Sequence, residues 1–121
     1  MNALNWFELF VSDFDRARTF YARLLNADLP VESGAPGGSM AMFPFDMENG
    51  VGGCLTLSAE QKPGAGGTRV YLNVNGQLDA VLDRVANAGG TILTGKTAIP
   101  PHGFFAVIRD TEGNEVGLHS L

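Results

Sequence analysis

The chain has 121 residues, a single cysteine and a formal net charge of −5 at pH 7, and 45% of its residues are hydrophobic. A chain of this length can bury one hydrophobic core without the support of disulfides or metal sites. The lone cysteine excludes an internal disulfide and favours a reducing cytoplasm. The acidic balance argues against nucleic acid or an anionic membrane as a partner. The sequence has no run of about 18 apolar residues, so no membrane helix is predicted. No signal peptide is predicted either.

The first predicted unit is a strand that turns sharply into a helix. Residues 6–11 are rich in β-formers, and the apolar residues of 14–25 recur at three- and four-residue steps. Ser12 or Asp13 is the predicted N-cap, because a short side-chain oxygen can accept from the N–H groups of the first turn. Residues 33–38 are predicted to form a Gly/Pro loop. Extended segments are expected at 28–32, 39–43 and 52–57, so this half reads βαβββ.

The second half repeats the order after a glycine-rich, linker-like stretch at 61–67. A strand at 69–74 leads through a turn into a second helix, which begins near Leu78. Gly89-Gly90 should end this helix as a C-cap. A loop with two prolines is expected at 97–103. Three further strands are predicted at 91–94, 104–108 and 115–119.

Landmarks in the two halves recur at a nearly constant offset. Asp46 and Asp110 are 110 − 46 = 64 residues apart, whereas Val11 and Val74 are 63 apart, so one residue slips at a turn. A period of half the chain indicates two copies of one supersecondary unit. The expected division is module 1 at about 1–60, a linker at 61–67 and module 2 at about 68–121.

Two stretches carry a family resemblance: VSDFDRARTFY at 11–21 and DTEGNEVGLHS at 110–120. Together with the repeat, these stretches resemble the vicinal oxygen chelate superfamily, and the resemblance covers nearly the whole chain. The superfamily includes glyoxalase I, extradiol dioxygenases, fosfomycin-resistance proteins and bleomycin-binding proteins. The resemblance implies an α+β fold: two tandem βαβββ modules forming a curved mixed β-sheet cup with the helices outside. It also implies a small-molecule ligand or substrate and a homodimer.

Alternation along the strands predicts which residues face the cup. On each strand, one set of alternate residues is uniformly apolar and should pack under the helix. The other set carries the polar residues, which is typical of a half-buried sheet with a functional or solvated face. The cup-facing residues predicted on the first strand of each module and on the last strand are Leu4, Trp6, Glu8, Phe10, Arg69, Tyr71, Asn73, Glu115, Gly117 and His119.

The family's metal ligands, carried over position by position, fall on Trp6, Gly53, Arg69 and Gly117. Divalent ions need imidazole, carboxylate or thiolate ligands, and these four side chains supply none. The resemblance therefore predicts no metal and no cofactor, and it excludes glyoxalase I and extradiol dioxygenase as literal activities. Cys54 is expected on the core face of its strand, as a small buried hydrophobe.

Three cup residues are candidates for proton transfer: Glu8, Tyr71 and His119, whose pKa values respond to burial. The alternative is that Glu8 pairs with Arg69 and the other two only line the cup. Arg69 is either an anchor for a carboxylate or phosphate or a structural partner of Glu8 or Glu115.

Aromatic and loop residues complete the predicted ligand site. Trp6 and Phe10, with Phe43 or Phe45 nearby, could stack on a flat or apolar ligand or simply fill the cup. His102 is either a rim residue or an exposed loop histidine. The candidate ligand-binding residues are Trp6, Phe10, Arg69, Asn73, His102 and Glu115.

Two functions fit these expectations. One is a metal-independent enzyme of lyase or isomerase type acting on a small organic metabolite, with Glu8, Tyr71 and His119 moving protons. The other is a non-catalytic protein that binds or sequesters a cationic or aromatic small molecule, as the bleomycin-binding group does. Solvent-open Glu8, Tyr71 and Glu115 would favour binding, whereas a buried Glu8 beside His119 would favour catalysis.

Overall fold

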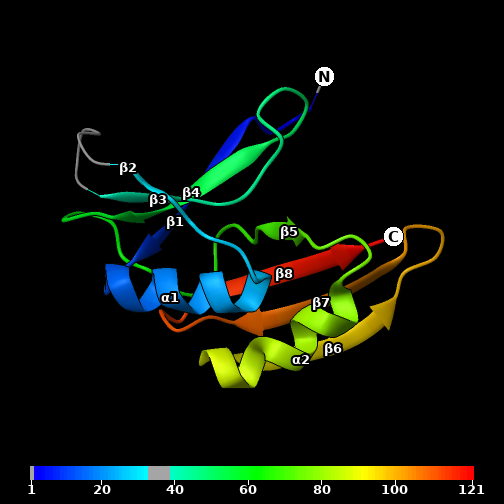
Figure 1. Ribbon diagram of the computed structural model, residues 1–121. Coiled ribbons are helices and arrows are strands. Elements are labelled where there is room, and N and C mark those ends of the chain that lie inside the picture. The colour runs from blue at the N-terminus through cyan, green and yellow to red at the C-terminus, as the bar shows by residue number, and fades with distance from the viewer. Residues whose placement is uncertain (1, 33–38) are drawn as a thin grey trace.

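Each half of the chain builds its own four-stranded mixed sheet in the computed structural model, which describes residues 2–32 and 39–121 (Figure 1). Sheet A has the order β1 (Trp6–Val11), β4 (Gly52–Leu57), β3 (Met40–Met42), β2 (Val31–Glu32). Sheet B has the order β5 (Tyr71–Asn73), β8 (Glu115–Ser120), β7 (Phe104–Arg109), β6 (Thr91–Ala98). The helices are α1 (Phe14–Leu25) and α2 (Leu78–Ala88). The predicted α+β fold of two βαβββ modules is confirmed.

The helix ends follow from local chemistry. Asp13 is the N-cap of α1, and its Oδ1 accepts the N–H of Arg16 at 3.0 Å. Asn26 ends α1 in the left-handed region. Gly89 ends α2 with a φ of 111°, a conformation that favours glycine, so the predicted C-cap is confirmed. Neither helix is long and apolar enough to cross a membrane.

Several strands differ in length from the prediction, and β5 covers only Tyr71–Asn73 of the predicted 69–74. β2 covers only Val31–Glu32, and the loop predicted at 33–38 lies outside the described residues. β6 runs on to Ala98, because Thr97 and Ala98 pair with Phe105 and Phe104 of β7. The prediction of a loop from residue 97 was therefore wrong by two residues, since cross-strand pairing overrides a weak local signal.

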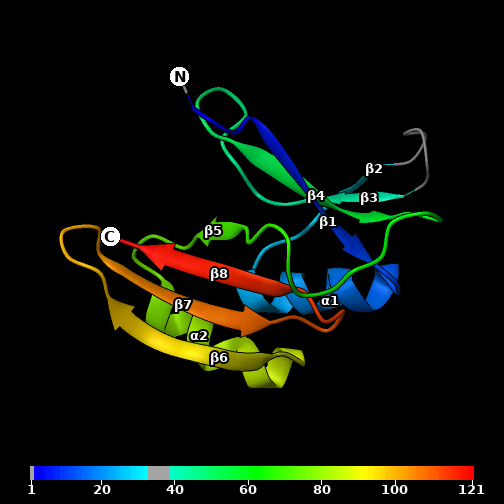
Figure 2. The same cartoon turned by 180° about the vertical axis from the view of Figure 1, so that it is seen from behind.

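One end of sheet A extends away from sheet B. Figures 1 and 2 show α1 and α2 on one face of sheet B, with β1 and β4 rising away from it. Among the described residues, no strand pairing joins sheet A to sheet B. Within one chain, the expected cup is thus made of two separate sheets.

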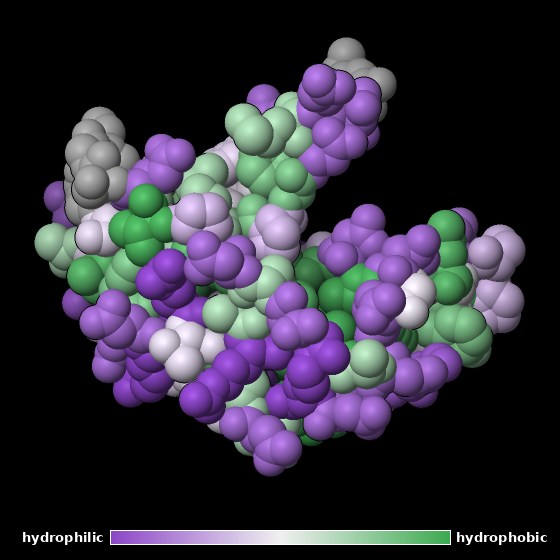
Figure 3. Space-filling view, viewed as in Figure 1, coloured by the Kyte–Doolittle hydropathy of each residue, from purple (hydrophilic) through white to green (hydrophobic). Residues whose placement is uncertain are grey.

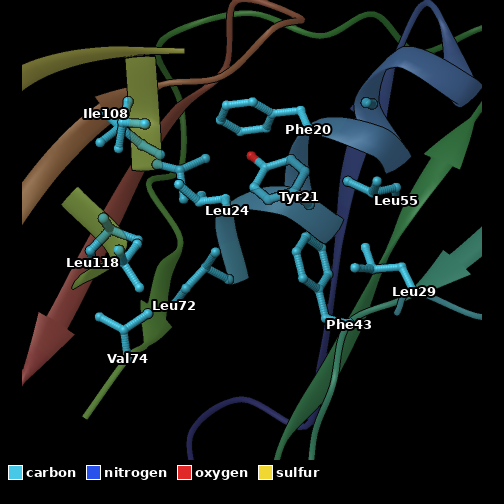
Figure 4. Close-up of a cluster of buried hydrophobic side chains, with 14 of the residues drawn as sticks. Phe20, Tyr21, Leu24, Leu29, Phe43, Leu55, Leu72, Val74, Ile108 and Leu118 are labelled. Atoms are coloured by element: carbon cyan, nitrogen blue, oxygen red, sulfur yellow. The ribbon is translucent and has the colours of Figure 1, made fainter. Parts of the chain in front are cut away.

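Helix α1 packs against residues of both modules, which therefore share one hydrophobic core. Phe20, Tyr21 and Leu24 are buried completely or almost so. Figure 4 shows them between residues of the two sheets. The module 1 side contributes Leu29, Phe43 and Leu55, and the module 2 side contributes Leu72, Val74, Ile108 and Leu118. One continuous apolar cluster therefore holds the two sheets in place.

A buried polar network ties the turn before β8 to α1. Asp110 Oδ2 accepts the hydroxyl of the fully buried Tyr21 at 2.7 Å, and its Oδ1 accepts the N–H groups of Glu112 and Asn114 at 2.8 and 2.9 Å. Asn114 Nδ2 donates to the carbonyl of Phe10 at 2.9 Å. Burial raises the pKa of Tyr21, and the neighbouring Asp110 raises it further. The second motif of the family resemblance thus has a structural role.

Glu112 closes the same network from the other side. Its Oε1 accepts the N–H groups of Ser12 and Asp13 at 2.9 and 2.8 Å, and its Oε2 pairs with Arg16 Nε at 2.8 Å. Burial raises the pKa of this carboxyl, but the bonds from Arg16, Asp13, Thr111 and Ser12 outweigh burial and lower the pKa from 4.5 to about 2. Glu112 therefore contributes to stability mainly as a carboxylate.

Candidate functional site

The outer face of sheet B, opposite the helices, carries an aromatic and polar cluster. Tyr71 pairs with Gly117, and His119 pairs with both Asn73 and Phe105. Directly paired residues point to the same face of a sheet, so these side chains share one surface. The Tyr71 ring lies over Gly117, where a Cβ atom would collide with it, and meets Phe105 edge-on with ring centroids 6.5 Å apart.

An open cavity of about 550 Å³ lies on this face. Apolar and aromatic side chains form most of its wall, with a few amide and imidazole groups among them. This composition is typical of a small-molecule pocket. The lining residues are Tyr71, Asn73, Asn75, Ile99, Phe105, His119 and Leu121.

The His119 ring is held by a main-chain group. Its Nε2 lies 2.7 Å from the carbonyl oxygen of His102. A carbonyl only accepts, so Nε2 carries the proton, and Nδ1 is the basic atom of the neutral ring. The side chain of His102 is exposed, so His102 reaches the cluster through its backbone.

Arg69 has an internal partner, Glu115. Arg69 Nη2 lies 3.4 Å from Glu115 Oε1, and the two side chains are 45% and 27% exposed. Of the two internal candidates predicted, the structure pairs Arg69 with Glu115, and Glu8 lies on the other sheet. A single long contact at this exposure is a weak ion pair.

Replacing Arg69 by Met should therefore change the free energy of unfolding by less than about 1 kcal/mol, because an exposed ion pair is worth little. Urea unfolding of wild type, Arg69→Met and Glu115→Gln measures the change. A loss several times larger would mean that the guanidinium has a further structural role.

The corresponding face of sheet A carries Trp6, Glu8 and Phe10 on β1. Trp6 meets Phe45 edge-on, with ring centroids 5.9 Å apart, and Glu8 is exposed. Phe43 instead packs on Phe7 in the core. Of the two phenylalanines predicted near Trp6, Phe45 is therefore the neighbour.

The register of β4 corrects one predicted position. Glu8 pairs with Cys54 and Phe7 with Gly53, so Cys54 shares the face of Glu8. The Phe7 ring lies over Gly53 on the core side. By this register Cys54, at 117 − 54 = 63 residues before Gly117, is the β4 residue that corresponds to Gly117. The expectation that Cys54 lies on the same face as the core residues of its strand was wrong, whereas the expectation that it is buried is confirmed. A one-residue slip exchanges the two faces of a strand.

The revised set of positions, Trp6, Cys54, Arg69 and Gly117, offers one thiol and no imidazole or carboxylate. Such a set does not fit a divalent ion of the kinds the family uses. The Tyr71 ring also covers Gly117. In the part of the chain that the structure describes, no three His, Cys, Asp or Glu residues come together as a metal cluster.

Cys54 itself is fully buried. Burial raises the pKa of its thiol and Glu8 raises it further, while hydrogen bonds with Thr56 and Trp6 oppose the rise. The thiol is therefore protonated at neutral pH and is not an activated nucleophile.

The structure divides the predicted proton-transfer group. Tyr71 and His119 lie together on sheet B with Asn73, whereas Glu8 lies on sheet A with Trp6 and Phe10. Phe105, Asn75, Ile99 and Leu121 were missed as lining residues. The alternation of β7 could have found Phe105, because Ala106 and Ile108 take the core parity.

A larger groove of about 1080 Å³ separates the free end of sheet A from module 2. Figure 3 shows it as a deep notch between an upper arm and the body of the molecule. Phe7 and Gly53 line it on one side, and Val74, Val81 and Arg84 on the other. The groove therefore opens onto side chains of the core.

Comparison with known proteins agrees with this architecture. Residues 3–118 match the family described as Glyoxalase/Bleomycin resistance protein/Dioxygenase superfamily. No curated protein matches the sequence. Among solved structures, the chain is similar to an antibiotic-binding protein from Streptomyces sp. CB03234, with a TM-score of 0.72 and 22% identity over 99% of this chain and 96% of that one.

Two further structures show the same likeness. A glyoxalase/bleomycin resistance protein from Albidiferax ferrireducens T118 has a TM-score of 0.76 at 17% identity, over 99% of both chains. A glyoxalase I mutant from Zea mays has a TM-score of 0.67 at 21% identity, over 95% of this chain and 45% of that one. At these identities the likeness shows the fold.

Proposed function

The chain belongs to the Glyoxalase/Bleomycin resistance protein/Dioxygenase superfamily, and from that premise we propose that it binds and sequesters a small organic molecule without a divalent metal or another cofactor. One observation carries this proposal. Glu8 is exposed on sheet A, away from the Tyr71 and His119 pocket on sheet B, so the three predicted proton-transfer groups do not come together within the chain.

The pocket chemistry supports an aromatic ligand. Tyr71 and Phe105 offer ring faces and edges, and Asn73 and His119 offer polar groups that could orient a ligand. Asn73 Oδ1 already accepts the N–H of Asn75 at 3.0 Å, so its amide N–H groups are the ones left for a ligand. The net charge of −5 supports a cationic ligand. The antibiotic-binding protein from Streptomyces supports the same class by analogy.

The remaining candidate residues have these roles in the proposal. Arg69 and Glu115 form a charged end of the pocket, and His102 positions His119. Trp6 and Phe10 lie on sheet A, so they supply further stacking surface from a second copy of the chain. A reducing cytoplasm suits the unpaired thiol of Cys54. We propose that the partner is a small molecule and not nucleic acid or a membrane.

The test is a thermal-shift and calorimetric titration with bleomycin, the cationic aromatic dye acridine orange and the anionic 1-naphthoate. We expect a saturable rise in Tm with a cationic or aromatic probe, because a ligand that binds only the folded state stabilises it. Tyr71→Ala should remove the shift. Ile92→Ala, at a residue 44% exposed on β6, is the matched control and should keep it. The proposal would be contradicted if none of the three probes gave a saturable shift.

A second candidate is a metal-independent lyase or isomerase that uses Tyr71 and His119. The anchored Nε2 of His119 favours it, because the bond to His102 fixes the ring and leaves Nδ1 as a base. His119→Gln separates the two functions, and turnover of the ligand that the screen identifies is the quantity that differs. In both cases the variant should keep most of its affinity. Only an enzyme shows turnover in the wild type and loses it in the variant.

We also propose a homodimer. The β1 edge of sheet A and the β5 edge of sheet B are not paired with each other within the chain, and the groove between them opens onto core side chains. Pairing with a second copy would cover such edges and complete the cup. Light scattering at micromolar concentration should give twice the chain mass of 12.8 kDa. A monomer mass under these conditions would count against the dimer.

A further inference from the structure

The face of sheet A that carries Glu8 also carries three sulfur atoms. Met42 is the direct cross-strand partner of Cys54, and Met40 is the partner of Thr56. Residues two apart on a strand point to the same face, so Met40, Met42 and Cys54 share one surface. Cys54 Sγ lies 3.6 Å from Met40 Sδ.

We propose that Met40, Met42 and Cys54 form a binding site for one soft monovalent metal ion, Cu⁺ or Ag⁺. Thiolate and thioether sulfurs are the ligands that select Cu⁺, whereas Mg²⁺, Mn²⁺ and Ca²⁺ prefer oxygen. The site shares only Cys54 with the four positions carried over from the family's divalent site. It does not depend on the organic ligand proposed above.

The distance between the two sulfur atoms suits a shared ion. With a metal–sulfur distance of about 2.3 Å, as for thiolates on zinc, two sulfurs 3.6 Å apart subtend about 100° at the ion. That angle is ordinary for an ion with three or four ligands. Met42 has three rotatable side-chain bonds and lies directly across from Cys54, so its sulfur can supply the third ligand.

The charge balance favours a monovalent ion. As the metal–sulfur bond forms, the Cys54 thiol releases its proton to solvent, and the resulting thiolate cancels one positive charge. Both methionine ligands are neutral, so a monovalent ion leaves no net charge among the ligands at a fully buried residue. A divalent ion would leave one uncompensated positive charge on the same three sulfurs.

The surroundings provide a cover and an entry path. Trp6 lies two residues before Glu8 on β1, so its side chain is on the same face of sheet A as Cys54 and stands beside the site. Glu8 pairs with Cys54 across the strands and is exposed, so its charge attracts cations to this surface. Met40 and Met42 are half-buried, so a rotamer change can open the site to solvent.

The experiment is an anaerobic competition between the reduced full-length protein and the chromophoric Cu⁺ chelator bicinchoninate. We expect one equivalent of Cu⁺ to be bound, Ag⁺ to displace it, and Zn²⁺ to have no effect. Cys54→Ser should abolish competition, and Met40→Leu or Met42→Leu should weaken it at least about tenfold, since each removes a ligand. Met47→Leu is the matched control, because Met47 is 86% exposed on a turn, and it should bind as wild type does.

Two results would overturn the proposal. One is a wild-type protein that cannot compete with the chelator. The other is a pair of leucine variants with wild-type affinity, which would mean that a lone thiol binds the ion. Methionine-to-leucine changes conserve volume, so these variants should keep their fold, and Tm checks this. X-ray absorption of the Cu⁺ complex gives a second readout: three sulfur ligands are expected, and one or none would contradict the site.

Discussion

Replacement of Asp110 by alanine should lower the free energy of unfolding by about 4 kcal/mol, because several buried groups lose their acceptor at once. Asp110 is 4% exposed and accepts four hydrogen bonds, from Tyr21, from Glu112 and two from Asn114. Its removal leaves the Tyr21 hydroxyl without that acceptor in a fully buried position. Urea unfolding monitored by circular dichroism measures the loss.

Asp46 provides the matched control from the other module. It lies 64 residues earlier, and its Oδ1 also accepts N–H groups two and three residues on, from Glu48 and Asn49, at 2.9 and 3.3 Å. Asp46 is exposed, so water replaces these bonds in Asp46→Ala, and the expected loss is below about 1 kcal/mol. Similar losses at Asp46 and Asp110 would show that burial of the network is not what stabilises the fold.

Glu112→Gln should cost about 3 kcal/mol at pH 7, the free energy that corresponds to lowering a pKa from 4.5 to about 2. The folded protein holds this carboxyl ionised more strongly than the unfolded chain does. Its stabilisation is therefore complete above about pH 4.5 and is lost as the pH falls toward 2. The stabilities of wild type and variant should converge over that interval, which urea unfolding at stepped pH measures.

Glu48→Gln is the control for this experiment, since Glu48 occupies the equivalent position of module 1 and is exposed. Its stability should follow the wild type at every pH. The role of the ionised carboxyl would be contradicted if the free energies of unfolding of Glu112→Gln and wild type differed by a constant amount from pH 7 to pH 2. A change in packing alone would give such a constant difference, because it does not depend on this titration.

The sequence by itself determined the features that depend on near neighbours. The Asp13 and Gly89 caps, the limits of β1, α1 and β4, and the two-module order follow from side chains within a few residues of each other. The alternation of apolar residues on β5 and β8 also placed Tyr71, Asn73 and His119 on one face. Local propensity and short periods suffice for such features, because the interactions that decide them lie within one turn or one strand.

Only the tertiary structure decided which faces and which distant residues meet. It placed Cys54 beside Glu8, left Glu8 on a different sheet from His119, and joined Glu112 to Ser12 across 100 residues. Strand register depends on packing between segments far apart in sequence, and a slip of one residue reverses the two faces. The sulfur cluster of sheet A therefore could not be predicted from the order of residues, since it exists only in the pairing of β3 with β4.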